Sequence, residues 1–279
     1  MKVLPGLLML WFAAFPLAAQ DAASGQGKLM VTSGGQTAEA LFRQLIAGPE
    51  PSVVFIPTGA SSLRSDSGVI WNPDKPEHRA EYEQEILKLF GLKRVTILHT
   101  RDRQVADTDA FVTPLRTAQA VWISGGNPGR LADAYLGTKV VDALKALIDR
   151  GGIVAGESAG AIIQGSYIVR GNPNKPVLMV DGHDRGLGLL PNVAINPHLS
   201  SNKRENELVS VIDRYPQLLG IGIDDDAGLL VSGEIAQVFG KGRVAIYDNR
   251  KHKDGWYYWL NPGDRFDLKT RMPIGRPIE

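Results

Sequence analysis

The sequence predicts an α/β fold: a mostly parallel sheet sandwiched by helices, with antiparallel strands added near the C-terminus. Three observations support this fold class. Short, continuous apolar runs recur along the first 160 residues. Segments with helical spacing of apolar residues separate these runs. Short apolar runs separated by Gly, Asp and Asn follow near the C-terminus. Continuous apolar strands that alternate with helices indicate a parallel sheet that is buried on both faces.

Five apolar runs are predicted to form the parallel strands, and they cover residues 28–32, 53–56, 95–98, 120–123 and 152–155. Helices are predicted at 37–47, 81–90, 140–150 and 159–164. Right-handed crossovers place the loops that follow parallel strands along one edge of the sheet, where ligands bind. We therefore expect the turns at 33–35, 58–59 and 124–126 to gather around Ser158.

Two further regions complete the chain's predicted organisation. Residues 61–77 are rich in Ser, Asp, Asn and Pro and are predicted to be a loop. Short strands are predicted after residue 218, at 219–223, 228–232, 237–239, 243–247 and 256–260, and we expect the last four to extend the same sheet. Since no linker or repeat interrupts the pattern, residues 28–279 are predicted to form a single domain.

The N-terminus has the pattern of a secretory signal peptide. Lys2 precedes a mostly apolar run that ends at Pro16, and small residues follow at Ala18 and Ala19. The run is shorter than the roughly 20 residues that a membrane span needs. We therefore expect residues 1–19 to be removed, residues 20–27 to be a flexible lead-in, and the protein to be exported to a periplasm or secreted.

Composition excludes several classes of function. The net charge is +1, with no long basic run, so the sequence predicts neither nucleic-acid binding nor attachment to a membrane after signal removal. No cysteine is present, which excludes disulfides, a cysteine nucleophile and thiolate metal sites. We expect no metal and no cofactor.

A nucleophile motif lies in the run Gly156–Gly160, which reads Gly-Glu-Ser-Ala-Gly. Here Ser158 stands between a β-branched strand and a helix of small residues, which is the context that a strained nucleophile turn requires. The N–H of Ala159 then points toward a developing oxyanion. The glycine turn after the neighbouring strand offers the N–H of Gly126 as the second donor. A serine hydrolase is therefore predicted.

The general base must come from five histidines. His183 and His198 are the two candidates that we retain, and we favour His198 because it follows the apolar strand at 193–195. His78 and His99 are expected to be structural or solvated, and His252 lies in a charged run. For the acid, Asp225 ranks first, since it follows the strand at 219–223, and Asp181 is the alternative.

These residues together resemble the cyanophycinase and aspartyl dipeptidase family of serine peptidases. The matching stretches are 124–127, 156–161, 186–191 leading to His198, and 220–225. The resemblance implies a flavodoxin-like or class I glutamine amidotransferase-like fold and a metal-free mechanism with Ser158, His198 and Asp225. It also implies a small aspartyl or β-aspartyl peptide as the substrate.

The chain departs from cyanophycinases around the histidine. Asn196-Pro197 stands where they have Asp-Gln. Of the three arginines that follow in them only Arg204 is kept, and Asn202 and Glu207 stand at the other two positions. We therefore expect a substrate other than cyanophycin. Substrate binding is assigned to Asn127, Arg204 and Lys203, the last two as partners of a substrate carboxylate.

Two alternatives remain open at this point. One is an α/β-hydrolase-type esterase that uses Ser158, Asp225 and His252. The other is a catalytically inactive exported binding protein of the same fold. The partner expected for the peptidase is a small peptide, and a homodimer is left open.

Overall fold

The computed structural model describes residues 26–275, apart from 47, 65–67, 69, 176 and 254. The predicted signal peptide at 1–19 and most of the predicted lead-in at 20–27 lie outside the described residues.

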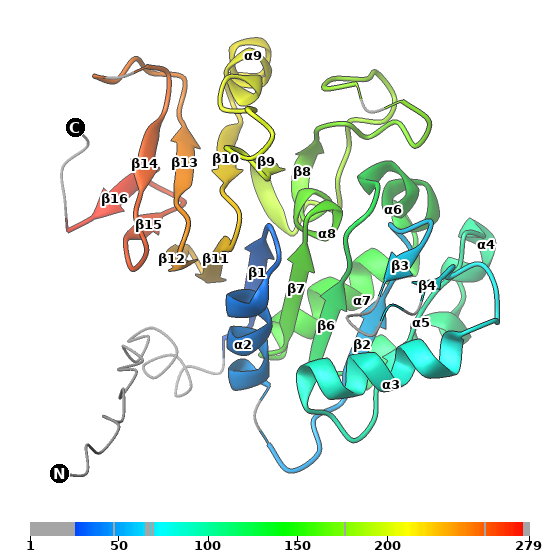
Figure 1. Ribbon diagram of the computed structural model, residues 1–279. Coiled ribbons are helices and arrows are strands. Elements are labelled where there is room, and N and C mark those ends of the chain that lie inside the picture. Colours follow the sequence, from blue (N-terminus) through cyan, green and yellow to red (C-terminus); the bar gives the residue numbers. More distant parts are fainter. Residues whose placement is uncertain are drawn as a thin grey trace, which may run out of the picture.

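A nine-stranded sheet forms the centre of the fold (Figure 1), with the order β16-β15-β12-β11-β1-β7-β6-β2-β5. Five neighbouring strands are parallel, which confirms the predicted sheet: β1 (Lys28–Thr32), β7 (Ile153–Glu157), β6 (Ala120–Ile123), β2 (Val53–Ile56) and β5 (Thr96–Ile97). The remaining four extend it as antiparallel strands: β11 (Ala227–Ser232), β12 (Ile235–Gly240), β15 (Arg265–Asp267) and β16 (Met272–Ile274).

A second sheet has five strands in the order β14-β13-β10-β9-β8. Three are parallel, namely β8 (Gly165–Ile168), β9 (Leu190–Pro197) and β10 (Leu219–Ile223). Two are antiparallel, namely β13 (Val244–Tyr247) and β14 (Tyr258–Leu260). The expectation that 243–247 and 256–260 extend the first sheet is therefore wrong. Both sheets contain strands buried on both faces, so an apolar run does not reveal which sheet it joins.

Helices cover both faces of the large sheet (Figure 1). The near face carries α2 (Gln36–Leu45) and α3 (Arg79–Phe90). The far face carries α5 (Asp109–Thr117) and α7 (Lys139–Asp149), with α4 (Arg103–Ala106) and α6 (Pro128–Tyr135) beside them. Two helices contact the second sheet, α8 (Ala159–Ile162) and α9 (Glu207–Arg214). The segment predicted as a loop holds a small hairpin of β3 (Leu63–Arg64) and β4 (Ile70–Trp71).

Strand alternation divides the hydrophobic core into two clusters. One cluster lies under α2 and α3, where the rings of Phe42, Phe90 and Trp122 meet with centroids 5.0 Å apart. The other contains Val121 and Val154 of the large sheet and Ile195 of the second sheet. Because the second cluster spans both sheets, it holds the strand ends of β7, β9 and β10 together.

Candidate active site

Ser158 stands at the junction of β7 and α8 with φ 50° and ψ −112°, a conformation that residues with a side chain rarely adopt. Its N–H donates to the carbonyl of Thr32 at the end of β1 (2.9 Å). The flanking glycines permit the turn, because a Cβ added to Gly156 would lie 2.1 Å from the carbonyl oxygen of Gly160. A Cβ on Gly160 would lie 2.1 Å from the carbonyl oxygen of Ile123. Steric contact with the neighbouring backbone therefore explains why both of these positions of the motif are glycine.

His198 directly follows β9, and its Nε2 lies 3.2 Å from Ser158 Oγ. On the other side of the ring, Nδ1 lies 2.6 Å from Asp225 Oδ1. When an ionised carboxylate accepts the Nδ1 proton, Nε2 is left as the acceptor for the serine hydroxyl. The structure thus brings together the serine, the histidine and the first-ranked carboxylate in the order that nucleophilic catalysis requires.

Hydrogen bonds from Ser201 and from His198 hold the pKa of Asp225 below its ordinary value. The carboxylate therefore stays ionised at neutral pH. Its side chain is 51% exposed, so water reaches this end of the Ser158–His198–Asp225 hydrogen-bonded chain. The alternative acid, Asp181, is 95% exposed and lies 3.9 Å from Arg214 at the end of α9. The structure therefore does not bring Asp181 to His198.

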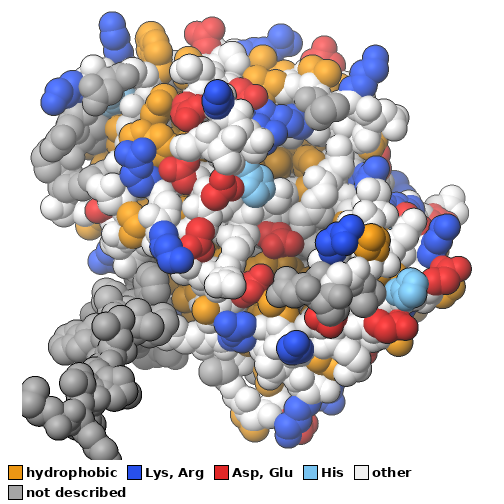
Figure 2. Space-filling model, viewed as in Figure 1, with side chains coloured by type: hydrophobic (Ala, Val, Ile, Leu, Met, Phe, Trp, Pro, Cys, Tyr) orange, Lys and Arg blue, Asp and Glu red, His pale blue; other side chains and the backbone are white. Residues whose placement is uncertain are grey.

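The two carboxylates beside Asp225 have other partners. Asp224 Oδ1 accepts from the N–H and hydroxyl of Ser200. Asp226 accepts from the N–H of Thr37 and pairs with Lys241 at 3.3 Å. Three consecutive aspartates thus divide into one that orients the histidine and two that fix the surrounding loops. Figure 2 shows that acidic side chains gather around a histidine near the centre of this face.

The Ser124–Asn127 turn packs against Ser158. A Cβ added to Gly125 would lie 3.4 Å from Ser158 Cβ, and the N–H of Gly125 donates to Glu157 Oε1 (3.2 Å). Among the described residues, the N–H groups of Ala159 and Gly126 have no hydrogen-bond acceptor. These are the two donors that the sequence singled out for an oxyanion.

Glu157 is a feature that the sequence reasoning passed over. Burial raises the pKa of its carboxyl, and the N–H of Gly125 partly offsets this effect. The nearby Glu39 adds to the increase in pKa. Ionising this partly buried carboxylate, one residue before Ser158, therefore has an energetic cost. In the sequence, only the position of Glu157 inside the 156–160 motif indicates that it lies close to Ser158.

The residues assigned to substrate binding differ in their availability. Asn127 caps α6, because its Oδ1 accepts from the N–H of Gly129 (2.8 Å) while its Nδ2 donates to the carbonyl of Asn172 (3.2 Å). Lys203 is exposed. Arg204 is partly buried, and burial lowers the pKa of its guanidinium, as does the neighbouring Arg170. Within the part of the chain that the structure describes, the Arg204 guanidinium makes no hydrogen bond or ion pair.

Arg170 was not identified from the sequence. It donates to Asn196 Oδ1 at 2.9 Å and forms an ion pair with Glu207. Asn196 Nδ2 also donates to Glu207, at 2.9 Å. Two positions at which the chain departs from cyanophycinases, 196 and 207, are thus linked to each other through one arginine. This cluster braces the strand end that carries His198.

His252 was expected to be solvated, and that expectation is wrong. Its side chain is only 9% exposed, and its Nε2 lies 2.8 Å from Asp248 Oδ1. The ring also packs edge-on against Tyr258, with centroids 4.7 Å apart. The ring of His252 therefore packs against residues of the second sheet and its connecting turn. The histidine that is hydrogen bonded to Ser158 is His198. This arrangement counts against the esterase alternative.

The described residues contain neither a metal-binding cluster nor a helix suited to crossing a membrane. No group of three or more His, Cys, Asp or Glu residues is arranged to hold a metal ion there. Over the same residues, no helix combines the length and apolar character that crossing a bilayer demands.

Comparison with known proteins gives concordant results. Residues 23–239 match the model of peptidase family S51. A cyanophycinase from Nostoc sp. is 32% identical over 213 residues, which cover 68% of this chain and 70% of that protein. A peptidase E from Actinobacillus pleuropneumoniae is 28% identical over 148 residues, which cover 50% of this chain and 62% of that protein. The crystal structure of a peptidase from an acI-B1 actinobacterium aligns with a TM-score of 0.65 and 23% identity, covering 87% of this chain and 97% of that one.

Proposed function

Because the chain belongs to peptidase family S51 and is a serine-type peptidase, we propose that Ser158, His198 and Asp225 are its catalytic triad. The observation that carries the proposal is the pair of contacts made by one imidazole, 3.2 Å to the serine hydroxyl and 2.6 Å to the carboxylate. The strained backbone of Ser158, with φ 50° and ψ −112°, supports it, since strained dihedrals concentrate at nucleophile turns.

The mechanism follows from these contacts. His198 Nε2 takes the proton of Ser158 as Oγ attacks the carbonyl carbon of the scissile amide. The N–H groups of Ala159 and Gly126 stabilise the oxyanion that forms. The imidazolium, held by Asp225, then protonates the leaving amine. Water next attacks the acyl-enzyme with His198 as the base, which frees Ser158.

For the substrate we propose small peptides with an aspartyl or β-aspartyl residue at the scissile bond. The support is the Arg204 guanidinium, which lies six residues after His198, is partly buried, and forms no hydrogen bond or close ion pair with the described side chains, although Glu207 attracts it at longer range. A planar guanidinium binds a carboxylate through two parallel hydrogen bonds. Relatives named cyanophycinase and peptidase E are consistent with this substrate class. Export of the mature chain is part of the same proposal.

A peptide-library digest tests the triad and the substrate class together. The library pairs α- and β-aspartyl dipeptides with matched glutamyl and neutral dipeptides. We expect Ser158→Ala and His198→Ala to lose at least about 10³-fold in kcat/KM on aspartyl bonds. His252→Ala is the matched control and should keep its activity if its fold is intact. Full activity in Ser158→Ala, or loss in His252→Ala but not in His198→Ala, would overturn the triad.

A further inference from the structure

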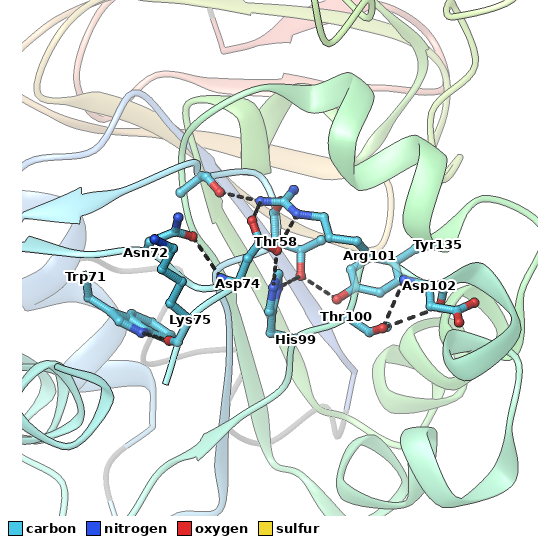
Figure 3. A network of polar contacts seen from close by, with 11 residues as sticks. Thr58, Trp71, Asn72, Asp74, Lys75, His99, Thr100, Arg101, Asp102 and Tyr135 are labelled. Atoms are coloured by element: carbon cyan, nitrogen blue, oxygen red, sulfur yellow. Dashed lines mark hydrogen bonds and ion pairs between the residues drawn. The ribbon is translucent and has the colours of Figure 1, made fainter. Parts of the chain in front are cut away.

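A network of polar side chains lies at the carboxyl ends of β2 and β5, outside the proposed triad (Figure 3). Asp74 Oδ1 lies 3.0 Å from His99 Nε2, and His99 Nδ1 lies 2.9 Å from Thr58 Oγ1. Thr58 Oγ1 in turn lies 2.5 Å from Tyr135 Oη. Thr58 is fully buried and Tyr135 nearly so, so the network reaches from the surface into the core.

Arg101 is the centre of this network. Its Nε and Nη2 contact both oxygens of Asp74, at 2.9 and 3.2 Å. The same guanidinium donates to the carbonyl oxygens of Thr58 and Ala60, the latter at 2.6 Å. A planar guanidinium that donates to two carbonyl oxygens of one turn fixes the position of that turn. The ion pair with Asp74 in turn fixes the position of the guanidinium.

The histidine supports the same turn from the other side. Since Asp74 accepts from Nε2, Nδ1 is left to accept from the Thr58 hydroxyl. Burial keeps the pKa of His99 below its ordinary value, which favours this neutral form. The hydroxyl of Thr58 is then free to accept from Tyr135. Each buried polar group in the chain of contacts is satisfied.

The turn at Thr58–Ala60 touches the glycine turn of the active site. The carbonyl of Gly59 accepts from the N–H of Asn127 (2.9 Å). A Cβ added to Gly126 would lie 2.3 Å from that same carbonyl oxygen. The backbones are therefore in direct contact, so a shift of Gly59 moves Gly126. Gly125 in turn packs against Ser158.

We propose that Arg101, held by Asp74, is a positioning residue that keeps the N–H of Gly126 at the oxyanion position by clamping the Thr58–Ala60 turn. This inference rests on the proposed function, since it needs Ser158 as the nucleophile and Gly126 as an oxyanion donor. Arg101 acts through backbone contacts and touches neither the substrate nor the triad. A misplacement of about 1 Å in such a site costs about 10²-fold in rate.

The test replaces Arg101 by Met, which keeps the length of the side chain and removes the guanidinium. The control is Arg103→Met, which replaces an exposed arginine at the start of α4 whose guanidinium donates to the carbonyl of Asp133, at 3.4 Å. On an aspartyl p-nitroanilide, we expect kcat of Arg101→Met to fall by about 10- to 100-fold, with KM within about threefold of wild type. Affinity for an aspartyl aldehyde, whose adduct carries the oxyanion, should fall in parallel with kcat. Arg103→Met should match wild type in all three measurements.

A second pair of variants keeps the inference testable if Arg101→Met does not fold. Thr58→Val removes the hydroxyl at nearly constant volume, and Thr58→Ser restores it. The hydroxyl joins the Thr58–Ala60 turn to His99 and Tyr135, so if the position of this turn sets that of Gly126, kcat should fall in the first variant and recover in the second. Wild-type kcat in a folded Arg101→Met, or equal losses in the valine and serine variants, would overturn the inference. The proposed function fails separately, if Ser158→Ala keeps wild-type activity.

Discussion

Replacing Asp225 by Asn tests the triad through its most exposed member. The carboxylate accepts from His198 Nδ1 at 2.6 Å, and it fixes the tautomer in which Nε2 accepts from Ser158. An amide in its place can donate to Nδ1, and the ring proton then moves to Nε2. That tautomer cannot take the serine proton. The comparable Asp→Asn change in a serine protease triad costs about 10⁴-fold in kcat.

Because Asp225 is exposed, we expect its replacement to lower activity by less than this. With 51% of the side chain exposed, water can hydrate Nδ1 and share the role of the carboxylate. We therefore expect Asp225→Asn to lower kcat/KM by about 10³-fold, or about 4 kcal/mol of transition-state stabilisation. Asp225→Ala should be less damaging, because it leaves a site for water and imposes no donor on Nδ1.

Steady-state hydrolysis of a β-aspartyl dipeptide measures these losses. The control is Asp226→Asn, which keeps the acceptor for the N–H of Thr37 and loses only an exposed ion pair with Lys241. The depressed pKa of Asp225 means that its carboxylate is ionised throughout the assay range. Its contribution is lost only as the pH falls through that depressed value. A loss of less than about tenfold, or an equal loss in Asp226→Asn, would refute the reasoning.

Three further predictions concern stability and chemistry. Gly156→Ala should destabilise the fold by about 3 kcal/mol or more in urea unfolding, since the new Cβ would lie 2.1 Å from the carbonyl of Gly160; a change under about 1 kcal/mol would contradict the close approach. Glu157→Gln should raise Tm at pH 8. The pKa of Glu157 is raised in the folded protein, so the stability of the wild type falls as the pH rises past the ordinary pKa of glutamate. Gln carries no charge and so does not lose this stability, and it still accepts from the N–H of Gly125. The gain should shrink toward pH 4, and a gain independent of pH would argue against the charge as its cause. A serine mechanism needs no metal, so EDTA should leave aspartyl hydrolysis unchanged, and inhibition that added Zn²⁺ reverses would refute it.

Much of the fold was predictable because its strands are short, buried on both faces and separated by helices. The parallel part of the large sheet follows from that pattern alone. Ser158 was visible since a strand, a turn with two small residues and a helix surround it. His198 could be identified as a polar residue directly after a buried strand, and Asp225 as a carboxylate two residues after the end of another. The second sheet could not be predicted, because the same apolar pattern fits a strand in either sheet.

Contacts made through the backbone were the main features that the sequence concealed. Arg101 grips the carbonyls of Thr58 and Ala60, some 40 positions away, and every residue has a carbonyl. No residue type therefore marks the clamp. His252 was misjudged for a related reason. The charged residues around it indicated solvent, but the turn between β13 and β14 folds its ring onto Tyr258 and Asp248.

The most direct test of the central claim is the site at which a fluorophosphonate probe labels the protein. Intact-mass and tandem mass spectrometry locate the adduct, and the triad predicts a single adduct on Ser158. Labelling should disappear in Ser158→Ala, and its rate should drop by at least about 10³-fold in His198→Ala. Substitutions in the Ser124–Asn127 turn or in the Asp224–Asp226 turn should leave the site of labelling unchanged. An adduct on another residue, or undiminished labelling in His198→Ala, would contradict the assignment of Ser158 as a nucleophile activated by His198.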